Sequence, residues 1–255
     1  MARLRHTDWP DRLWIVRHGQ SAGNVARDEA ELAQTHLIDI ETRDADTPLS
    51  DLGHRQSKAL AAWFADLPAD ERPNVLLTSP FVRAQQTIHA VADALRIDRA
   101  DIVVDERLRE KEFGILDRYT VAGIQATFPE LAAQRAQVGK FYFRPPGGES
   151  WCDVLLRLRS VTEVLRRDHV GERVLIVAHQ VIVNCFRYLL ECMDEQQILD
   201  IDRKADVPNC SITEYALDRN WRDARFELQV ANFALPVAAG GAPVTDAADA
   251  PAGPK

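Results

Sequence analysis

The chain has 255 residues, of which 46% are hydrophobic and 27% are charged, and its formal net charge at pH 7 is −8. This composition is typical of a globular protein with a substantial core. The negative charge, without any run of Lys and Arg, excludes a general nucleic-acid-binding protein. No apolar stretch of about 18 residues is available to cross a membrane, and the polar N-terminus lacks the apolar segment of a secretory signal. We therefore expect a cytoplasmic protein that binds neither nucleic acid nor membranes.

The first half of the chain alternates predicted strands with predicted helices. Residues 13–16 are a short apolar run with β-branched side chains, which is typical of a buried strand. A turn at 19–23 leads into a short helix, and a polar loop follows to about residue 48. Ser50 is expected to cap the next helix. Residues 74–77 predict a second strand, and Ser79-Pro80 predicts the start of a helix that runs to about residue 95.

The second half repeats this alternation. Residues 102–104 predict a third strand, followed by an irregular polar segment to 118 and a helical pattern over 121–138. The Pro- and Gly-rich segment 144–148 must be a loop, and Ser150 is expected to cap the helix after it. Residues 173–178 predict a long buried strand and 181–190 a helix. Two segments of alternating polarity, 212–217 and 226–230, predict the last two strands.

Strands that alternate with helices favour an α/β fold. We expect a three-layer sandwich with a mainly parallel central sheet flanked by helices on both faces. A single domain is predicted over residues 1–235. From Pro236 the chain is rich in Ala, Gly and Pro and has little to bury, so residues 236–255 are predicted to form a disordered tail.

Charged and polar residues follow each of the first four predicted strands. In an open α/β sheet, ligands bind beyond the carboxyl ends of the strands. Arg17 and His18 follow the first strand, and Arg83 lies near the start of the helix after the second. Glu110 comes after the third strand, and His179 directly follows the fourth. A parallel sheet would bring these five side chains to one edge.

This set of residue types suits phosphoryl transfer. The planar guanidinium of an arginine grips two phosphoryl oxygens and keeps its charge. A neutral imidazole is a competent nucleophile near pH 7, and a backbone carbonyl is expected to hold the second nitrogen of His18. Glu110 is a candidate to protonate the leaving oxygen. The scheme requires neither a metal nor a cofactor.

The segment Arg17-His18-Gly19-Gln20-Ser21, with Asn24, resembles the signature of the histidine phosphatase superfamily, whose founding members are phosphoglycerate mutases. The resemblance continues in the family's order through residues 48–56, 78–87, 108–114, 147–150 and 177–179. The triplet Arg17-His18-Gly19 alone would carry little weight, whereas the five further matches in the same order make the resemblance specific.

The resemblance implies roles for individual residues. His18 is expected to be the phosphorylated nucleophile, and Glu110 the proton donor and later the base. The expected contacts to the phosphoryl group come from Arg17, Asn24, Arg83 and His179. The candidate substrate-binding residues are Gln20, Ser21 and Gln180.

Two departures from the family pattern concern substrate selection. Gln180 stands where the second histidine is usually followed by glycine, and residues 115–118 replace a segment in which many relatives carry a further glycine. The 69 residues from Glu110 to His179 resemble the phosphatase members more than the mutases, which carry a longer insert. We therefore expect a phosphomonoester hydrolase that acts on a small phosphorylated metabolite of unknown identity.

Three alternatives remain at this stage. A mutase would return the phosphoryl group to a second hydroxyl, and a catalytically weak binding or scaffolding member of the same fold would only hold ligands. Residues 19–23 also match the G-x-S-x-G nucleophile elbow, which would make Ser21 the nucleophile of a serine hydrolase. Too little chain precedes residue 13 to supply that fold's oxyanion hole. The oligomeric state stays open, with a homodimer as one option.

Overall fold

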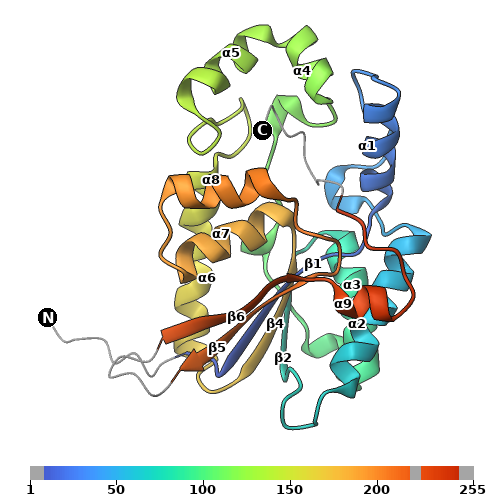
Figure 1. Ribbon diagram of the computed structural model, residues 1–255, viewed down its shortest axis with the longest axis vertical. Coiled ribbons are helices and arrows are strands. Elements are labelled where there is room, and N and C mark those ends of the chain that lie inside the picture. Colours follow the sequence, from blue (N-terminus) through green and yellow to red (C-terminus); the bar gives the residue numbers. More distant parts are fainter. Residues whose placement is uncertain (1–8, 219–224, 247–255) are drawn as a thin grey trace, which may run out of the picture.

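The computed structural model describes residues 9–218 and 225–246 (Figure 1). Within these ranges a six-stranded sheet with the order β3-β2-β4-β1-β5-β6 forms the middle layer. Its strands are β1 (Arg12–Arg17), β2 (Val75–Thr78), β3 (Val103–Val104), β4 (Arg173–Ala178), β5 (Ile212–Asp218) and β6 (Arg225–Phe233). The strands β3, β2, β4 and β1 pair in parallel. Strand β5 pairs antiparallel with β1, and β6 pairs antiparallel with β5. The predicted mainly parallel sheet is therefore confirmed.

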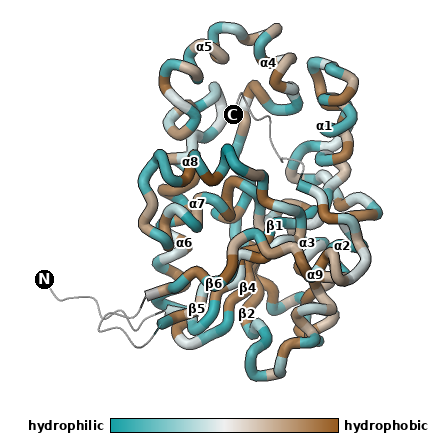
Figure 2. Tube along the Cα trace, viewed as in Figure 1, coloured by the Kyte–Doolittle hydropathy of each residue, from teal (hydrophilic) through white to brown (hydrophobic). Residues whose placement is uncertain are grey.

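Helices cover both faces of this sheet because its strands are apolar on both sides. Along β1, Leu13 and Ile15 enter one core, while Trp14 and Val16 enter the other, as the alternation of a strand requires. The first core lies under α6 (Trp151–Asp168), α7 (Gln180–Leu190) and α8 (Glu195–Lys204), and the second under α2 (Asp51–Asp66), α3 (Val82–Leu95) and α9 (Leu235–Ala239). Figure 2 shows hydrophobic segments gathered around the central strands. The three-layer α/β architecture is confirmed.

The remaining α-helices stand beyond the carboxyl ends of the parallel strands, in the upper part of Figure 1. They are α1 (Ala22–Leu32), α4 (Val121–Thr127) and α5 (Pro129–Val138). The pattern over 121–138 predicts one helix, but the chain breaks at Phe128 because the residue before a proline is disfavoured in helical conformation. Four short 3-10 helices complete the list: η1 (Asp44–Asp46), η2 (Arg99–Asp101), η3 (Glu106–Leu108) and η4 (Gly114–Leu116).

The helix starts predicted from capping residues are correct in two cases out of three. The hydroxyls of Ser50 and Ser150 accept backbone N–H groups in the first turns of α2 and α6. Ser79 does not cap α3, which begins at Val82 with Phe81 at the cap position. Helix α8 was not predicted, because its sequence is polar and Ile198 is its only buried apolar side chain.

The prediction of a disordered tail is wrong for residues 236–246. Helix α9 begins at Leu235, and Val237 and Ala242 are buried in the core beneath α2 and α3. A Cβ atom on Gly240 would lie 2.4 Å from the Cβ of Ala59, so small residues are what allow this segment to lie against α2. Residues 247–255 of the predicted tail lie outside the described residues. In the described ranges, no helix has the length and apolar character needed to span a membrane.

Candidate active site

His18 lies at the carboxyl end of β1 and is fully buried. Its backbone N–H donates to the carbonyl of Ala178, at the end of the neighbouring β4, at 3.0 Å. Nδ1 lies 2.6 Å from the carbonyl oxygen of Gly19, which can only accept, so Nδ1 carries the ring proton. Nε2 accepts a hydrogen bond from Nε of Arg83 at 3.1 Å. The lone pair of the ring is therefore on the nitrogen that faces a cation.

Gly19 is required by close packing. A Cβ atom there would lie 2.7 Å from the carbonyl oxygen of Gly53 in α2 and 2.9 Å from the hydroxyl of Ser57. Its backbone N–H donates to Oγ1 of Thr87 in α3 at 3.1 Å. The loop that carries His18 is thus held against two helices of the sheet's second face.

Two buried arginines lie beside the histidine. Nη1 of Arg17 donates to the carbonyl of Val207 at 2.6 Å. Nη1 of Arg83 donates to the carbonyl of Asp44 at 2.6 Å and lies 2.9 Å from the carboxylate of the same residue. The guanidinium of Arg83 also lies 4.9 Å from the ring centroid of Phe81, a cation–π distance. These contacts fix both guanidiniums at the edge where His18 lies.

The second histidine, His179, lies next to the first. The two ring centroids are 5.1 Å apart, and His179 is fully buried at the cap position of α7. Nε2 of His179 lies 2.7 Å from the hydroxyl of Ser79. Ser79, predicted as a helix cap, therefore orients the second histidine instead.

Glu110 follows η3 and is only 1% exposed. Its Oε1 accepts the backbone N–H of Lys111 at 2.7 Å, and its backbone carbonyl accepts from Arg157 of α6 at 3.2 Å. Arg157 in turn pairs with Glu149 at 2.9 Å, so Glu149 supports the segment that carries Glu110. The segment is therefore anchored to α6 from outside the site.

Asn24 and Ser21 form the capping box of α1. The hydroxyl of Ser21 accepts the backbone N–H of Asn24, and Oδ1 of Asn24 accepts the backbone N–H of Ser21 at 2.9 Å. The serine-hydrolase alternative requires His179 to activate Ser21. His179 instead bonds to Ser79. The G-x-S-x-G match is therefore explained by a helix cap.

The glutamines predicted to contact substrate are tied to neighbouring loops. Oε1 of Gln20 accepts the hydroxyl hydrogen of Ser50 at 2.8 Å. Nε2 of Gln180 donates to Asp206 at 2.7 Å, and Gln180 is 6% exposed. Both side chains therefore lie at the site's border and set its shape through these bonds.

Three residues that support the histidine loop were not predicted from the sequence. Nδ2 of Asn209 donates to the carbonyl of His18 at 3.0 Å, and Oδ1 of Asn209 accepts from the hydroxyl of Thr245 at 2.9 Å. Nε2 of Gln56 also donates to Oγ1 of Thr245 at 2.9 Å, while its Oε1 accepts the backbone N–H of Gln20 at 2.8 Å. Gln56 belongs to a motif of the resemblance, but no local signal marks the other two.

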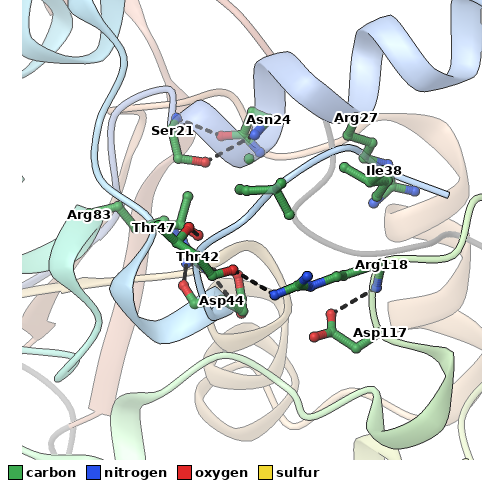
Figure 3. A pocket seen from close by; sticks show the side chains of 12 residues that line it. Ser21, Asn24, Arg27, Ile38, Thr42, Asp44, Thr47, Arg83, Asp117 and Arg118 are labelled. Carbon is green, nitrogen blue, oxygen red and sulfur yellow. Dashed lines mark hydrogen bonds and ion pairs between the residues drawn. The ribbon is translucent and has the colours of Figure 1, made fainter.

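A pocket opens beside Arg83, between α1, the loop before Pro48 and residues 117–118 (Figure 3). Its empty space, the open mouth included, is about 490 Å³. Arg118 lines it with φ of +64°, and its guanidinium donates to the carbonyl of Thr42 at 2.9 Å. Burial, and next the carboxylate of Asp44, raise the pKa of Asp117. One departure from the family pattern thus lies in the wall of this pocket.

Two buried imidazoles and two buried guanidiniums thus lie beyond the carboxyl ends of the parallel strands, and groups of these types suit the binding of a phosphoryl group. The profile of the histidine phosphatase superfamily, branch 1, matches residues 13–231. The chain belongs to this superfamily.

Relatives of known name fall into two groups. The 2,3-bisphosphoglycerate-dependent phosphoglycerate mutase of Sinorhizobium fredii is 29% identical over 200 residues, which cover 77% of this chain and 87% of the mutase. The mycobacterial glucosyl-3-phosphoglycerate phosphatase, solved in complex with VO3, is 25% identical with a TM-score of 0.64 and covers 88% of this chain and 99% of its own. Mycobacterial hydrolase 1 is 26% identical with a TM-score of 0.66, covering 87% and 98%.

Proposed function

We propose that the protein is a metal-independent, cytoplasmic phosphomonoesterase that hydrolyses a small phosphorylated metabolite through a phosphohistidine at His18. The observation that carries this proposal is the state of that ring. Nδ1 is held by the carbonyl of Gly19 at 2.6 Å, and Nε2 receives a hydrogen bond from a buried arginine, Arg83. A ring fixed in this tautomer presents its nucleophilic nitrogen where a phosphoryl group would be bound by guanidinium.

In the first half-reaction, Nε2 of His18 attacks phosphorus in line with the leaving oxygen. The P–N bond forms as the P–O bond to the organic group breaks, and protonated Glu110 gives its proton to the departing oxygen. Arg17, Arg83 and His179 stabilise the charge on the three equatorial oxygens. The products are the free alcohol, the phosphohistidine and the Glu110 carboxylate.

In the second half-reaction, water takes the position of the alcohol. Glu110 accepts a proton from this water while its oxygen attacks phosphorus and the P–N bond breaks. Inorganic phosphate leaves, and both side chains return to their starting protonation states. Burial of the site limits water to the one that enters after the alcohol departs.

A mutase is the second candidate, and the 29% identity to a phosphoglycerate mutase over 87% of that protein supports it. Two observations support the hydrolase hypothesis. Two solved proteins named as a phosphatase or a hydrolase are 25–26% identical to this chain, and the segment between Glu110 and His179 is short. Isomerisation of a phosphoglycerate faster than release of inorganic phosphate would favour the mutase.

The test is a screen of phosphorylated metabolites with phosphate release as readout, with His18→Ala as control. We expect the variant to lose activity by at least about 10⁴-fold and to form no acid-labile phosphoenzyme. Undiminished turnover in the variant, or a phosphoenzyme that maps to another residue, would contradict the mechanism. No turnover by the wild type on any compound would favour a scaffolding role.

A further inference from the structure

A second cavity lies in the cap, which we define as α4, α5 and the segments 111–116 and 143–145 that face them. Nine of its twelve lining residues are apolar, among them Phe113, Ile124, Leu131 and Phe143. Its volume is about 250 Å³, close to the lower end, about 300 Å³, of sites for small organic molecules. It shares no lining residue with the pocket beside Arg83.

The helices of the cap leave this cavity open. Helix α5 has no buried residue, and in α4 only Gly123 is buried. Leu131, Ala132 and Ile124 line the cavity while remaining partly exposed. In Figure 1 the two helices stand away from the sheet, and among the described residues neither of the two cores includes a residue of α4 or α5. The apolar lining is therefore accessible to a ligand.

Two cations line the same cavity without an acidic partner. Lys111 is 8% exposed, and its Nζ lies 4.1 Å from the ring centroid of Phe113. Arg135 is half-buried on α5. Within the described residues, no carboxylate lies at ion-pair distance from either of them, and none lines the cavity. Burying an ammonium without an ion-paired carboxylate costs free energy, and an anion bound in the cavity would offset that cost.

We infer that the cap cavity binds an organic anion with a compact apolar body. The apolar lining would take the body, and Lys111 with Arg135 would take a carboxylate or phosphate group. This ligand chemistry has two sources: the organic part of a phosphomonoester substrate, or a separate effector molecule. The same residues would bind the ligand in either case. Only the first source depends on the proposed hydrolysis.

The direct test is binding of 1-naphthoate to the full chain, measured by titration calorimetry, with 1-naphthalenemethanol as the uncharged probe of similar shape. We expect Lys111→Met to weaken naphthoate binding by about tenfold or more, since a charge-assisted bond is lost. Ala132→Phe fills the cavity and is expected to abolish binding. Ala133→Phe, on the exposed side of the same helix, is the matched control and should bind as the wild type does.

His18→Ala separates this inference from the proposed function, because the variant is expected to bind naphthoate unchanged even when hydrolysis is lost. Lys111→Met adds no bulk, so it remains informative if Ala132→Phe does not fold. The inference would be overturned if the wild type did not bind naphthoate, or if folded Lys111→Met and Ala132→Phe bound it as tightly as the wild type.

Kinetics then distinguish the two sources. If the cavity takes the substrate's organic part, Ala132→Phe raises the KM for 1-naphthyl phosphate and leaves the KM for glycerol phosphate unchanged. If it takes an effector, both KM values stay unchanged in that variant. Naphthoate then alters turnover of glycerol phosphate by the wild type but not by the variant.

Discussion

The proposed catalytic site and the cap cavity meet at two neighbouring residues, Glu110 and Lys111, and they are built in opposite ways. Around His18, every ring and guanidinium is tied by hydrogen bonds to the backbone or to a neighbouring side chain. In the cap, the ammonium of Lys111 lies over the ring of Phe113, and it forms no ion pair with a carboxylate of the described residues. We expect from this comparison that the proposed chemistry requires fixed positions, whereas ligand binding in the cap cavity tolerates an adaptable surface.

The largest change in activity is expected for substitution of Glu110. Glu110→Gln keeps the shape but removes the transferable proton, so we expect kcat to fall by about 10²–10⁴-fold for alkyl phosphates. The loss should be smaller for p-nitrophenyl phosphate, whose leaving group needs little protonation. Steady-state kinetics on both substrates measure the difference. An equal loss on both would assign Glu110 a structural role.

A smaller effect is expected at Thr245. Two successive hydrogen bonds, through Asn209, connect its hydroxyl to the backbone carbonyl of His18. Thr245→Val keeps the volume and removes the hydroxyl, and with it the hydrogen bonds to Asn209 and Gln56, so we expect kcat to fall about fivefold. Thr245→Ser is the matched control and should restore activity. If the valine variant alters only KM, Thr245 does not position His18.

In the cap, removal of charge should stabilise the protein. Burial lowers the pKa of Lys111 from its ordinary 10.5 to about 8, although Glu110 and Glu149 act in the opposite direction and Arg135 and Lys140 add to the lowering. At neutral pH, holding this ammonium charged costs stability, so Lys111→Met should raise the free energy of unfolding by about 1–3 kcal/mol. Urea denaturation at pH 7 measures this.

The same pKa predicts a pH dependence. Between about pH 8 and 10.5 the unfolded chain holds the Lys111 proton that the folded chain has released, so wild-type stability from this group rises with pH there. Lys111→Met should lack that contribution, and Lys58→Met, an exposed site on α2, should retain it. Parallel pH profiles for the wild type and Lys111→Met would show that the group does not titrate in this range.

The smallest effect is expected at Asp44, whose carboxylate lies 2.9 Å from Nη1 of Arg83 and is 44% exposed. Because it competes with a phosphoryl group for the same guanidinium, Asp44→Asn should tighten inhibition by vanadate about two- to fivefold, a modest change for a solvent-screened pair. Glu31→Gln, which affects the ion pair of Arg27, is a control. Weaker inhibition would mean that Asp44 orients Arg83.

The sheet, and the gathering of His18, Arg83 and His179 at its edge, could be predicted because both leave local signals. Apolar runs marked β1 and β4, and polar residues directly after them marked the edge. Helix α8 left no such signal, since only Ile198 of its apolar side chains is buried. The sequence around Ser79 is typical of a helix cap, but its hydroxyl forms a hydrogen bond with His179, which is 100 residues away in the sequence. Lys111 could not be predicted to line a cavity, because that depends on how α4 and α5 stand over it.

The tie between Thr245, Asn209 and His18 has a consequence for synthesis of the chain. Asn209 lies 191 residues after His18, and Thr245 a further 36 residues on. A ribosome therefore makes the loop that carries His18 first and these two supports much later. A nascent chain can build β1 and both histidines and still lack the hydrogen bonds that hold the carbonyl of His18. Catalytic competence should accordingly appear late in translation, as a single step after the sheet has formed.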